Sequence, residues 1–310
     1  MKVLVTGADG FVGRHLVRHL LQAGDEVAAG CRPGGPVVDW GAGAPPRAGV
    51  AVRPLEVTDD ASIRDALAWG PEAVVHLAAV ASGRQARRDP GVAWEINAAG
   101  TARVVEALGS GTFFLLVSTG EVYGMGTGIA HREFDPVEPV SAYAASKAGA
   151  EIASFEAARR KHLKVIVARA FPHTGPGQDP RYVIPALAAR LSAAKRAGHT
   201  TIPTGNLDPV RDLLDVRDVA AAYVGLLEKG AEGGVYNVAS GTGHPLREVF
   251  ERLQQLVGWR VTAQFDSSLG RPSDIMHLVG DASMLRSATD WAPRYALDRT
   301  LQDLLDAQTN

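Results

Sequence analysis

The sequence has little of what usually marks a cross-linked, membrane-bound or polyanion-binding protein. Its 310 residues include one cysteine, Cys31. A disulfide framework or a zinc site of several cysteines is therefore excluded, and a reducing compartment, the cytoplasm, is expected. Lysine and arginine total 32 against 34 acidic residues, and this near balance gives no reason to expect a nucleic-acid partner. No apolar run approaches the roughly 20 residues of a membrane-spanning helix, so no membrane partner is expected.

Short β-branched segments alternate with longer segments of helical spacing through the first half of the chain. The β-branched segments lack polar alternation, which is typical of strands buried on both faces. Their order predicts an α/β fold, a Rossmann-like doubly wound parallel sheet. The predicted strands are Lys2–Thr6, Glu26–Ala29, Val50–Leu55, Ala73–Leu77, Thr112–Ser118 and Lys164–Arg169, and the predicted helices are Phe11–Ala23, Ala61–Trp69, Val92–Leu108 and Ala142–Lys161.

The pattern changes near Phe171, because a series of prolines from Pro172 to Pro209 predicts loops and short helices. We expect a Rossmann domain formed by residues 1–170 and 215–240, and a smaller, discontinuous C-terminal domain formed by residues 171–214 and 241–310. Ligands of such sheets bind at the carboxyl ends of the strands, where the two domains would meet. The later predicted elements are a helix over Val216–Glu228, a strand over Gly234–Val238, a helix over Leu246–Val257 and an irregular tail.

The strand Lys2–Thr6 runs directly into a loop with Gly7, Gly10 and Gly13, and then into a helix. Gly7 suits a tight turn, Gly10 lets the backbone approach a pyrophosphate, and Gly13 allows close packing of helix against strand. The free N–H groups at the start of the helix then face the anion. This order of strand, loop and helix predicts a dinucleotide-binding site.

The second strand is followed by Cys31 and Arg32, where NAD-selective sites usually carry an acid that binds the ribose 2′-hydroxyl. An arginine fork can instead bind a 2′-phosphate. NADP(H) is therefore favoured as the cofactor and NAD(H) stays open, while the alternative is that Arg32 is an ordinary surface arginine. The glycine- and proline-rich segment Arg32–Gly49 is predicted to be a surface loop.

Tyr143 and Lys147 lie four residues apart in a predicted helix, so their side chains share one face. A free phenol, with a pKa near 10, is a poor acid–base catalyst at neutral pH. An ammonium at ~5 Å in an effective dielectric of ~20 stabilises the phenolate by about 3 kcal/mol, or roughly two pKa units. Such a pair occurs by chance in many helices and alone indicates only a surface feature. Together with the glycine loop and Thr119, a hydroxyl at the end of a strand, it predicts a proton-transfer site.

Together these features resemble the extended short-chain dehydrogenase/reductases, a superfamily of nucleotide-sugar epimerases, dehydratases and reductases, over essentially the whole chain. The resemblance implies that Thr119 orients the substrate oxygen, that Tyr143 transfers the proton and that Lys147 binds the nicotinamide ribose. Asn97 either contacts the cofactor or bridges buried backbone. The further residues that carry the resemblance are His76–Ala79, Gly100, Thr101 and Val122–Gly124, and the implied cofactor contacts are Phe11, Val12, Leu77, Ala78, Ala79, Asn97, Phe171 and His173.

The second half of the chain resembles the GDP-6-deoxy-D-mannose reductases and, in part, the GDP-mannose 4,6-dehydratases. A buried diphosphate needs fixed cations, which Arg211 and Arg271 would supply, although most arginines form only surface ion pairs. Pro172 stands where relatives commonly carry asparagine, which indicates an altered sugar pocket. The segments that carry the resemblance are Phe171–Gln178, Gly205–Asp208, Arg211–Asp212 and Tyr236–Gly241, and it implies a GDP-linked or, as second choice, dTDP-linked sugar that contacts Ser82, Val183, Asn206, Leu207, Arg211, Arg271 and Asp274.

Glu121 and Gly120 bear on the type of reaction. In the 4,6-dehydratases that this chain resembles, a glutamate at the place of Glu121 removes a proton, and its neighbour carries a hydroxyl or an acid. Gly120 can do no proton chemistry. We therefore expect an oxidoreductase in which NADPH reduces the C4 ketone of a nucleotide-linked 4-keto-6-deoxy-hexose. The alternatives are a nucleotide-sugar dehydratase or epimerase with tightly bound NAD(P), and a non-catalytic NADP-binding regulator.

The resemblance also implies a homodimer, because relatives pair the helices that correspond to Val92–Leu108 and Ala142–Lys161 across a two-fold axis. No metal site is expected, since His173 has no histidine, cysteine or acid at metal-ligand spacing. The expected chemistry therefore depends on side chains and a nicotinamide cofactor alone.

Overall fold

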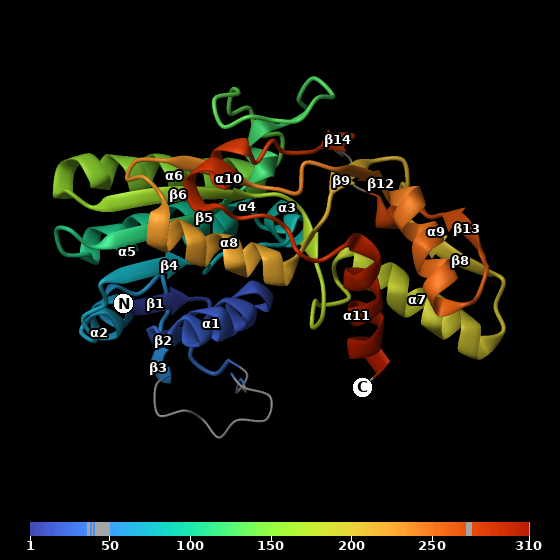
Figure 1. Ribbon diagram of the computed structural model, residues 1–310, viewed down its shortest axis with the longest axis horizontal. Helices are drawn as coiled ribbons and strands as arrows, with labels where there is room; N and C mark the ends of the chain where they lie inside the picture. The colour runs from blue at the N-terminus through green and yellow to red at the C-terminus, as the bar shows by residue number, and fades with distance from the viewer. Residues whose placement is uncertain (36–37, 39, 41–49, 271–274, 310) are drawn as a thin grey trace.

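A sheet of seven parallel strands forms the centre of the computed structural model, which describes residues 1–35, 38, 40, 50–270 and 275–309. The strand order is β11-β6-β5-β4-β1-β2-β3, with helices on both faces (Figure 1). The chain reverses its direction of travel across the sheet at β1, which confirms the predicted Rossmann-like topology. The strands are β1 (Lys2–Thr6), β2 (Glu26–Cys31), β3 (Val50–Pro54), β4 (Ala73–His76), β5 (Phe113–Thr119), β6 (Lys164–Ala170) and β11 (Val235–Val238).

Alternation along β1 divides the core of the sheet into two layers. Val3 and Val5 pack with Leu16 of α1 on one face, whereas Leu4 packs with Val104 of α5 on the other. All five side chains are fully or almost fully buried, as expected for a strand covered on both sides. One layer holds α1 (Phe11–Ala23), α8 (Val216–Lys229) and α10 (Ser283–Thr289), and the other holds α2 (Asp60–Leu67), α5 (Gly100–Ala107) and α6 (Ala142–Lys161) (Figure 1).

The helix predicted over Val92–Leu108 is interrupted. The chain instead forms α4 (Pro90–Trp94), a π-helical turn over Glu95–Ala99, and then α5. Asn97 lies on this wider turn and is buried, with its amide bonded to other elements. A π turn leaves the hydrophobic pattern almost unchanged while it alters the hydrogen bonding, so the periodicity of the sequence did not reveal it.

The second half of the chain is more regular than its prolines indicate. The helix α7 (Val183–Ala197) has 15 residues, because Pro185 lies in its first turn, where the missing N–H has no intrahelical partner to lose. The predicted irregular tail contains α10 and α11 (Leu297–Thr309). The helices α7, α9 (Leu246–Val257) and α11 share a second apolar core. In contrast, α10 packs on α8 of the sheet domain. The residue boundaries of the two domains stay a prediction.

The smaller lobe, with α7, α9 and α11, lies to the right in Figure 1, and the short strands β9 (Val210–Asp212), β12 (Gly243–Pro245) and β14 (His277–Leu278) lie between it and the sheet domain. Most of the predicted surface loop Arg32–Gly49, together with Arg271 and Asp274, lies outside the described residues. Among the described residues, no helix is both long and apolar enough to cross a membrane. The remaining elements are α3 (Gly83–Arg88), a 3-10 turn over Gly120–Tyr123, another over Ser267–Leu269, β7 (His173–Thr174), β8 (Thr201–Thr204), β10 (Leu214–Asp215) and β13 (Thr262–Phe265).

Candidate active site

The glycine loop lies between the end of β1 and the start of α1, as predicted. Gly7 has a φ of +65°, and a Cβ placed there would lie 2.9 Å from the backbone nitrogen of Ala78. A Cβ at Gly13 would lie 2.5 Å from the carbonyl oxygens of Gly7 and Ala8. Gly10 precedes α1 with extended backbone and no side-chain cap. Only glycines allow this close packing, and the uncapped N–H groups at the helix start fit an anion such as a pyrophosphate.

Arg32 follows β2 beside this loop. The carbonyl of Gly30 accepts a hydrogen bond of 3.1 Å from the backbone of Ala8, so the end of β2 adjoins the glycine loop. The Arg32 side chain is exposed, and among the described residues it makes no ion pair. Its guanidinium, carried two residues after Gly30, could accept a phosphate on the ribose of a bound dinucleotide.

Tyr143 and Lys147 lie on α6, which packs on β5, the strand that Thr119 ends. Ser141 caps α6 by accepting a hydrogen bond from the backbone of Ala144, which places Tyr143 in the first turn and Lys147 one turn later. Lys147 is 3% exposed, and burial lowers its pKa to about 8 against the opposing effect of Glu151. Thr119 ends β5, and its hydroxyl accepts a hydrogen bond from the backbone of Glu121.

A buried ion pair lies directly behind these residues. Glu151, one turn beyond Lys147 on α6, bonds Arg169 of β6 in a bidentate manner, with distances from 2.8 to 3.3 Å, and accepts a 2.5 Å hydrogen bond from Ser118. The guanidinium of Arg169 also lies over the ring of Tyr123, 4.9 Å from its centroid. Sequence reasoning missed this group, although its signal was an acid four residues from Lys147 on one helix face.

Asn97 bridges buried backbone, one of the two roles expected for it. Its side-chain oxygen accepts from the backbone of Val80, and its amide donates to the carbonyl of Val80 and to the hydroxyl of Ser146. Because Ser146 in turn donates to the carbonyl of Tyr143, Asn97 ties the loop after β4 to the first turn of α6. A contact between Asn97 and the cofactor stays a prediction.

Phe11, Phe171 and His173 meet where the loop after β6 passes the start of α1. The rings of Phe11 and His173 stack with centroids 6.2 Å apart, and Nδ1 of His173 is hydrogen-bonded to the carbonyl of Phe171. Burial lowers the pKa of His173, so its imidazole is neutral at pH 7. Among the described residues, no group of three His, Cys, Asp or Glu side chains could hold a metal ion.

A cavity of about 220 Å³ opens between the sheet domain and the smaller lobe. It is bounded by Glu121 and the α6 residues Ser141 and Ala142 on one side, and by Arg211 of β9 on the other. Arg211 donates to the carbonyl of Ile275 at 2.6 Å. The remaining lining residues are Gly83, Arg87, Pro90, Val140, Ile275 and Leu278.

The other predicted substrate residues are not on the described wall of this cavity. Ser82 caps α3 next to Gly83, and Asn206 bonds the backbone of Asp208. Leu207 is buried in the core of the smaller lobe, and Val183 is exposed at the start of α7. Leu207 could therefore reach a ligand only through its backbone.

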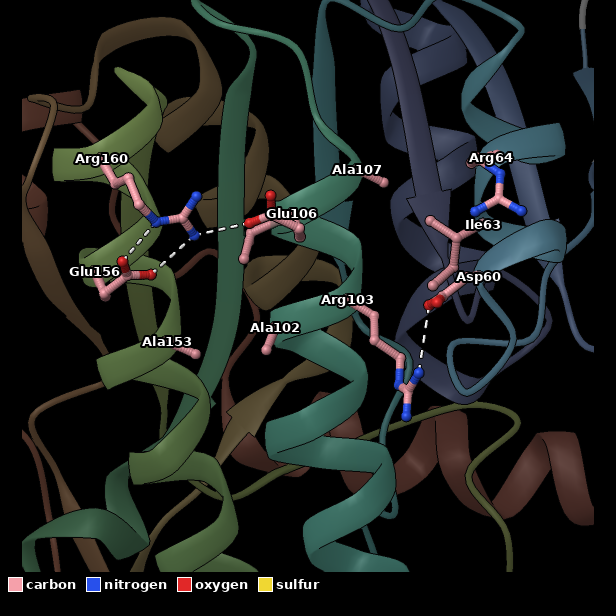
Figure 2. A pocket seen from close by; sticks show the side chains of 11 residues that line it. Asp60, Ile63, Arg64, Ala102, Arg103, Glu106, Ala107, Ala153, Glu156 and Arg160 are labelled. Atoms are coloured by element: carbon pink, nitrogen blue, oxygen red, sulfur yellow. Dashed lines mark hydrogen bonds and ion pairs between the residues drawn. The ribbon is translucent and has the colours of Figure 1, made fainter.

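A larger cavity, of about 600 Å³, lies far from this chemistry, among α2, α5 and α6 (Figure 2). Its charged side chains neutralise one another: Arg160 bonds Glu156 and Glu106, and Arg103 pairs with Asp60. It holds none of the predicted site residues, so the smaller cavity, beside the first turn of α6, is the candidate active site.

Comparison with known proteins identifies the family of this chain. Residues 3–239 match the family described as NAD dependent epimerase/dehydratase. The chain is 32% identical to GDP-6-deoxy-D-mannose reductase of Pseudomonas aeruginosa, over 98% of this chain and 96% of the relative. It is similar to the structure of RMD from Pseudomonas aeruginosa complexed with NADPH (31% identity, TM-score 0.83, covering 99% of this chain and 98% of that one). It is also similar to UDP-glucose 4-epimerase of Thermus thermophilus in complex with NAD (30% identity, TM-score 0.87, covering 100% and 99%).

These matches span nearly the whole chain, and the relatives that they name modify nucleotide sugars. We conclude that this protein is an enzyme of the NAD dependent epimerase/dehydratase family.

Proposed function

We propose that this protein uses NADPH to reduce the C4 ketone of a nucleotide-linked 4-keto-6-deoxy-hexose, with GDP-4-keto-6-deoxy-mannose as the favoured substrate. The observation that carries the proposal is the position of the Tyr143 turn of α6 at a cavity whose other wall holds Arg211. Ser141 and Ala142, which precede Tyr143 directly in the chain, line one side of the cavity, and Arg211 on the other side offers a cation for a diphosphate. The similarity to the Pseudomonas aeruginosa reductase supports the same substrate.

The chain supplies positioning and a proton. When bound, NADPH supplies the hydride for C4. Thr119 orients the carbonyl oxygen, and Tyr143 donates its phenolic proton to the oxygen as negative charge develops there. Lys147 is largely protonated at pH 7, because its pKa is about 8, and its ammonium stabilises the phenolate left on Tyr143. Lys147 also binds the nicotinamide ribose.

Arg32 supports NADP(H) over NAD(H). Its exposed side chain follows β2, whose end adjoins the glycine loop, and the residues that follow β2 immediately, Arg32 and Pro33, include no carboxylate that would repel a 2′-phosphate. The Pseudomonas aeruginosa relative was solved with NADPH and the Thermus thermophilus epimerase with NAD. NAD(H) is accordingly the second choice.

The surroundings of Gly120 support reduction rather than dehydration. A Cβ at Gly120 would lie 2.9 Å from three ring atoms of Phe171, which is itself buried. The ring therefore leaves no room for the acid or hydroxyl that the resembling dehydratases carry at this position. Glu121 does line the cavity, so a 4,6-dehydratase or an epimerase with tightly bound NAD(P) is the second candidate function.

A homodimer in the cytoplasm completes the proposal. Ile152 on α6 is 71% exposed, and Trp94 on α4 is 46% exposed. The small residues Ala102 on α5 and Ala153 on α6 line the larger cavity among α2, α5 and α6 (Figure 2). Exposed apolar side chains on two adjacent helices favour a helical interface between two copies, and sedimentation equilibrium of wild type and Ile152→Asp would test it.

The decisive experiment offers NADPH with GDP- and dTDP-linked 4-keto-6-deoxy-hexoses and follows cofactor oxidation. We expect turnover of the GDP-linked ketone, loss of more than about 99% of the rate in Tyr143→Phe, and wild-type rates in Tyr295→Phe, which alters a tyrosine outside the site. Retention of more than a few per cent of the rate by Tyr143→Phe would refute the assignment of the proton donor. Formation of a 4-keto product from GDP-mannose alone would instead identify a dehydratase.

A further inference from the structure

The short helix α3 presents an arginine to the candidate active site. Arg84, Arg87 and Arg88 all belong to α3, but only Arg87 lines the cavity between the lobes. The helix is anchored by Ala86, which is fully buried and packs in a small cluster with Ala93 and Tyr143. Arg87 therefore projects from a segment that is packed against the catalytic turn.

Within the described part of the chain, Arg87 makes no hydrogen bond or ion pair with any side chain. This distinguishes it from Arg103 and Arg160 of the larger cavity, which pair with acids beside them, whereas Arg64 of that cavity makes no such bond among the described residues (Figure 2). It also differs from Arg211, which is tied to the backbone of Ile275. A guanidinium that faces a cavity without a protein acceptor retains its donors for a ligand.

The charges around the cavity favour an anion. Its lining includes two cations, Arg87 and Arg211, and one acid, Glu121, so two positive charges minus one negative charge leave one positive charge. Arg87 belongs to the sheet domain, whereas Arg211 belongs to β9 in the second half of the chain. A diphosphate between them would be bound from both lobes, and the planar fork of each arginine suits its oxygens.

We propose that Arg87 binds the diphosphate of the nucleotide-sugar substrate and, with Arg211, makes that group the link between the two lobes. This assignment rests on the proposed function, because it takes the ligand to be a nucleoside diphosphate sugar. It extends that function to a residue outside every motif of the sequence that indicated substrate binding. Arg87 is a binding residue, and it takes no part in proton transfer.

Calorimetric titration with GDP and, separately, with dTDP tests the assignment on the full-length protein. We expect Arg87→Ala to weaken binding of whichever nucleotide the wild type binds by about 10- to 100-fold, the range for a lost charge-assisted hydrogen bond. The affinity of Arg87→Lys for the nucleotide should fall between those of wild type and Arg87→Ala, because lysine keeps the charge and lacks the planar guanidinium fork. Raising the salt concentration should weaken wild-type binding more than that of Arg87→Ala.

Arg84→Ala and Arg88→Ala are the matched controls, since each removes the same charge from the same helix outside the cavity. Both should bind the nucleotide within about twofold of wild type. Affinity for NADPH and the melting temperature should be unchanged in all four variants, which would show that the fold and the cofactor site are intact.

Two results would overturn the assignment while leaving the proposed function in place. One is wild-type affinity for the nucleotide in Arg87→Ala. The other is equal loss in Arg84→Ala or Arg88→Ala, which would indicate a general effect of positive charge. Failure of the wild type to bind either nucleotide would refute the proposed function itself.

Discussion

The buried pair of Arg169 and Glu151 leads to a specific prediction about stability. Arg169 is 6% exposed and Glu151 is 5% exposed, and their bidentate contact reaches 2.8 Å. Replacing arginine by methionine in Arg169→Met keeps most of the side-chain volume and removes the charge. The carboxylate of Glu151 is then left buried, with the hydroxyl of Ser118 as its remaining side-chain hydrogen-bond partner among the described residues.

The cost of Arg169→Met follows from this burial. Removing one partner of a buried ion pair typically costs about 3–5 kcal/mol, because the other charge stays in a medium of low dielectric. At about 2 °C per kcal/mol for a chain of this size, the melting temperature should fall by roughly 6–10 °C. Replacing both partners, in Arg169→Met with Glu151→Leu, should recover most of the loss, since neither charge of the pair is then buried.

Thermal and urea unfolding of these variants provide the measurement. The control is Arg160→Met, which removes the same group from an exposed ion pair with Glu156 (Figure 2) and should leave the unfolding transition unchanged within error. If Arg169→Met unfolded no earlier than Arg160→Met, the pair would contribute nothing through burial. A double variant as unstable as the single one would likewise contradict the explanation, because the loss would then come from packing.

Three further predictions concern the site. Burial lowers the pKa of Lys147 from 10.5 to about 8, so between these pH values the unfolded chain binds a proton that the folded chain does not. The free energy of unfolding of wild type relative to Lys147→Met, measured in urea, should therefore rise by about 3 kcal/mol from pH 8 to 10.5. A constant difference between the two proteins would contradict the burial. Gly120→Asp should lose about 1–3 kcal/mol through overpacking against Phe171 and form no 4-keto product from GDP-mannose. Gly109→Asp should unfold like wild type, because a Cβ there would lie 3.9 Å from the Thr112 hydroxyl, an ordinary contact. Arg32→Asp should lower the NADPH-to-NADH ratio of kcat/KM by at least about tenfold, and an unchanged ratio would rule out a 2′-phosphate contact.

Much of the fold could be predicted because its signals are local. The limits of α6 and α9 agree with the periodicity of their sequences, and every strand of the central sheet was expected to within a few residues. The glycine loop could be predicted for the same reason, since its spacing and the flanking strand and helix are consecutive in the chain. The 15-residue helix α7 was missed because the density of prolines outweighed the favourable position of one of them.

The sequence predicted part of the site's chemistry, and the tertiary structure decided the rest. Consecutive residues predicted the dinucleotide loop, and i, i+4 spacing together with that loop and Thr119 predicted the Tyr143 and Lys147 pair, because neighbours in sequence must be neighbours in space. The partners of Glu151, the ring that fills the space beside Gly120, and the appearance of Arg87 in one cavity with Arg211 could not be foreseen. Each joins residues far apart in the chain, and such contacts arise only when helices and strands pack, since packing, not sequence distance, sets which side chains share a buried volume.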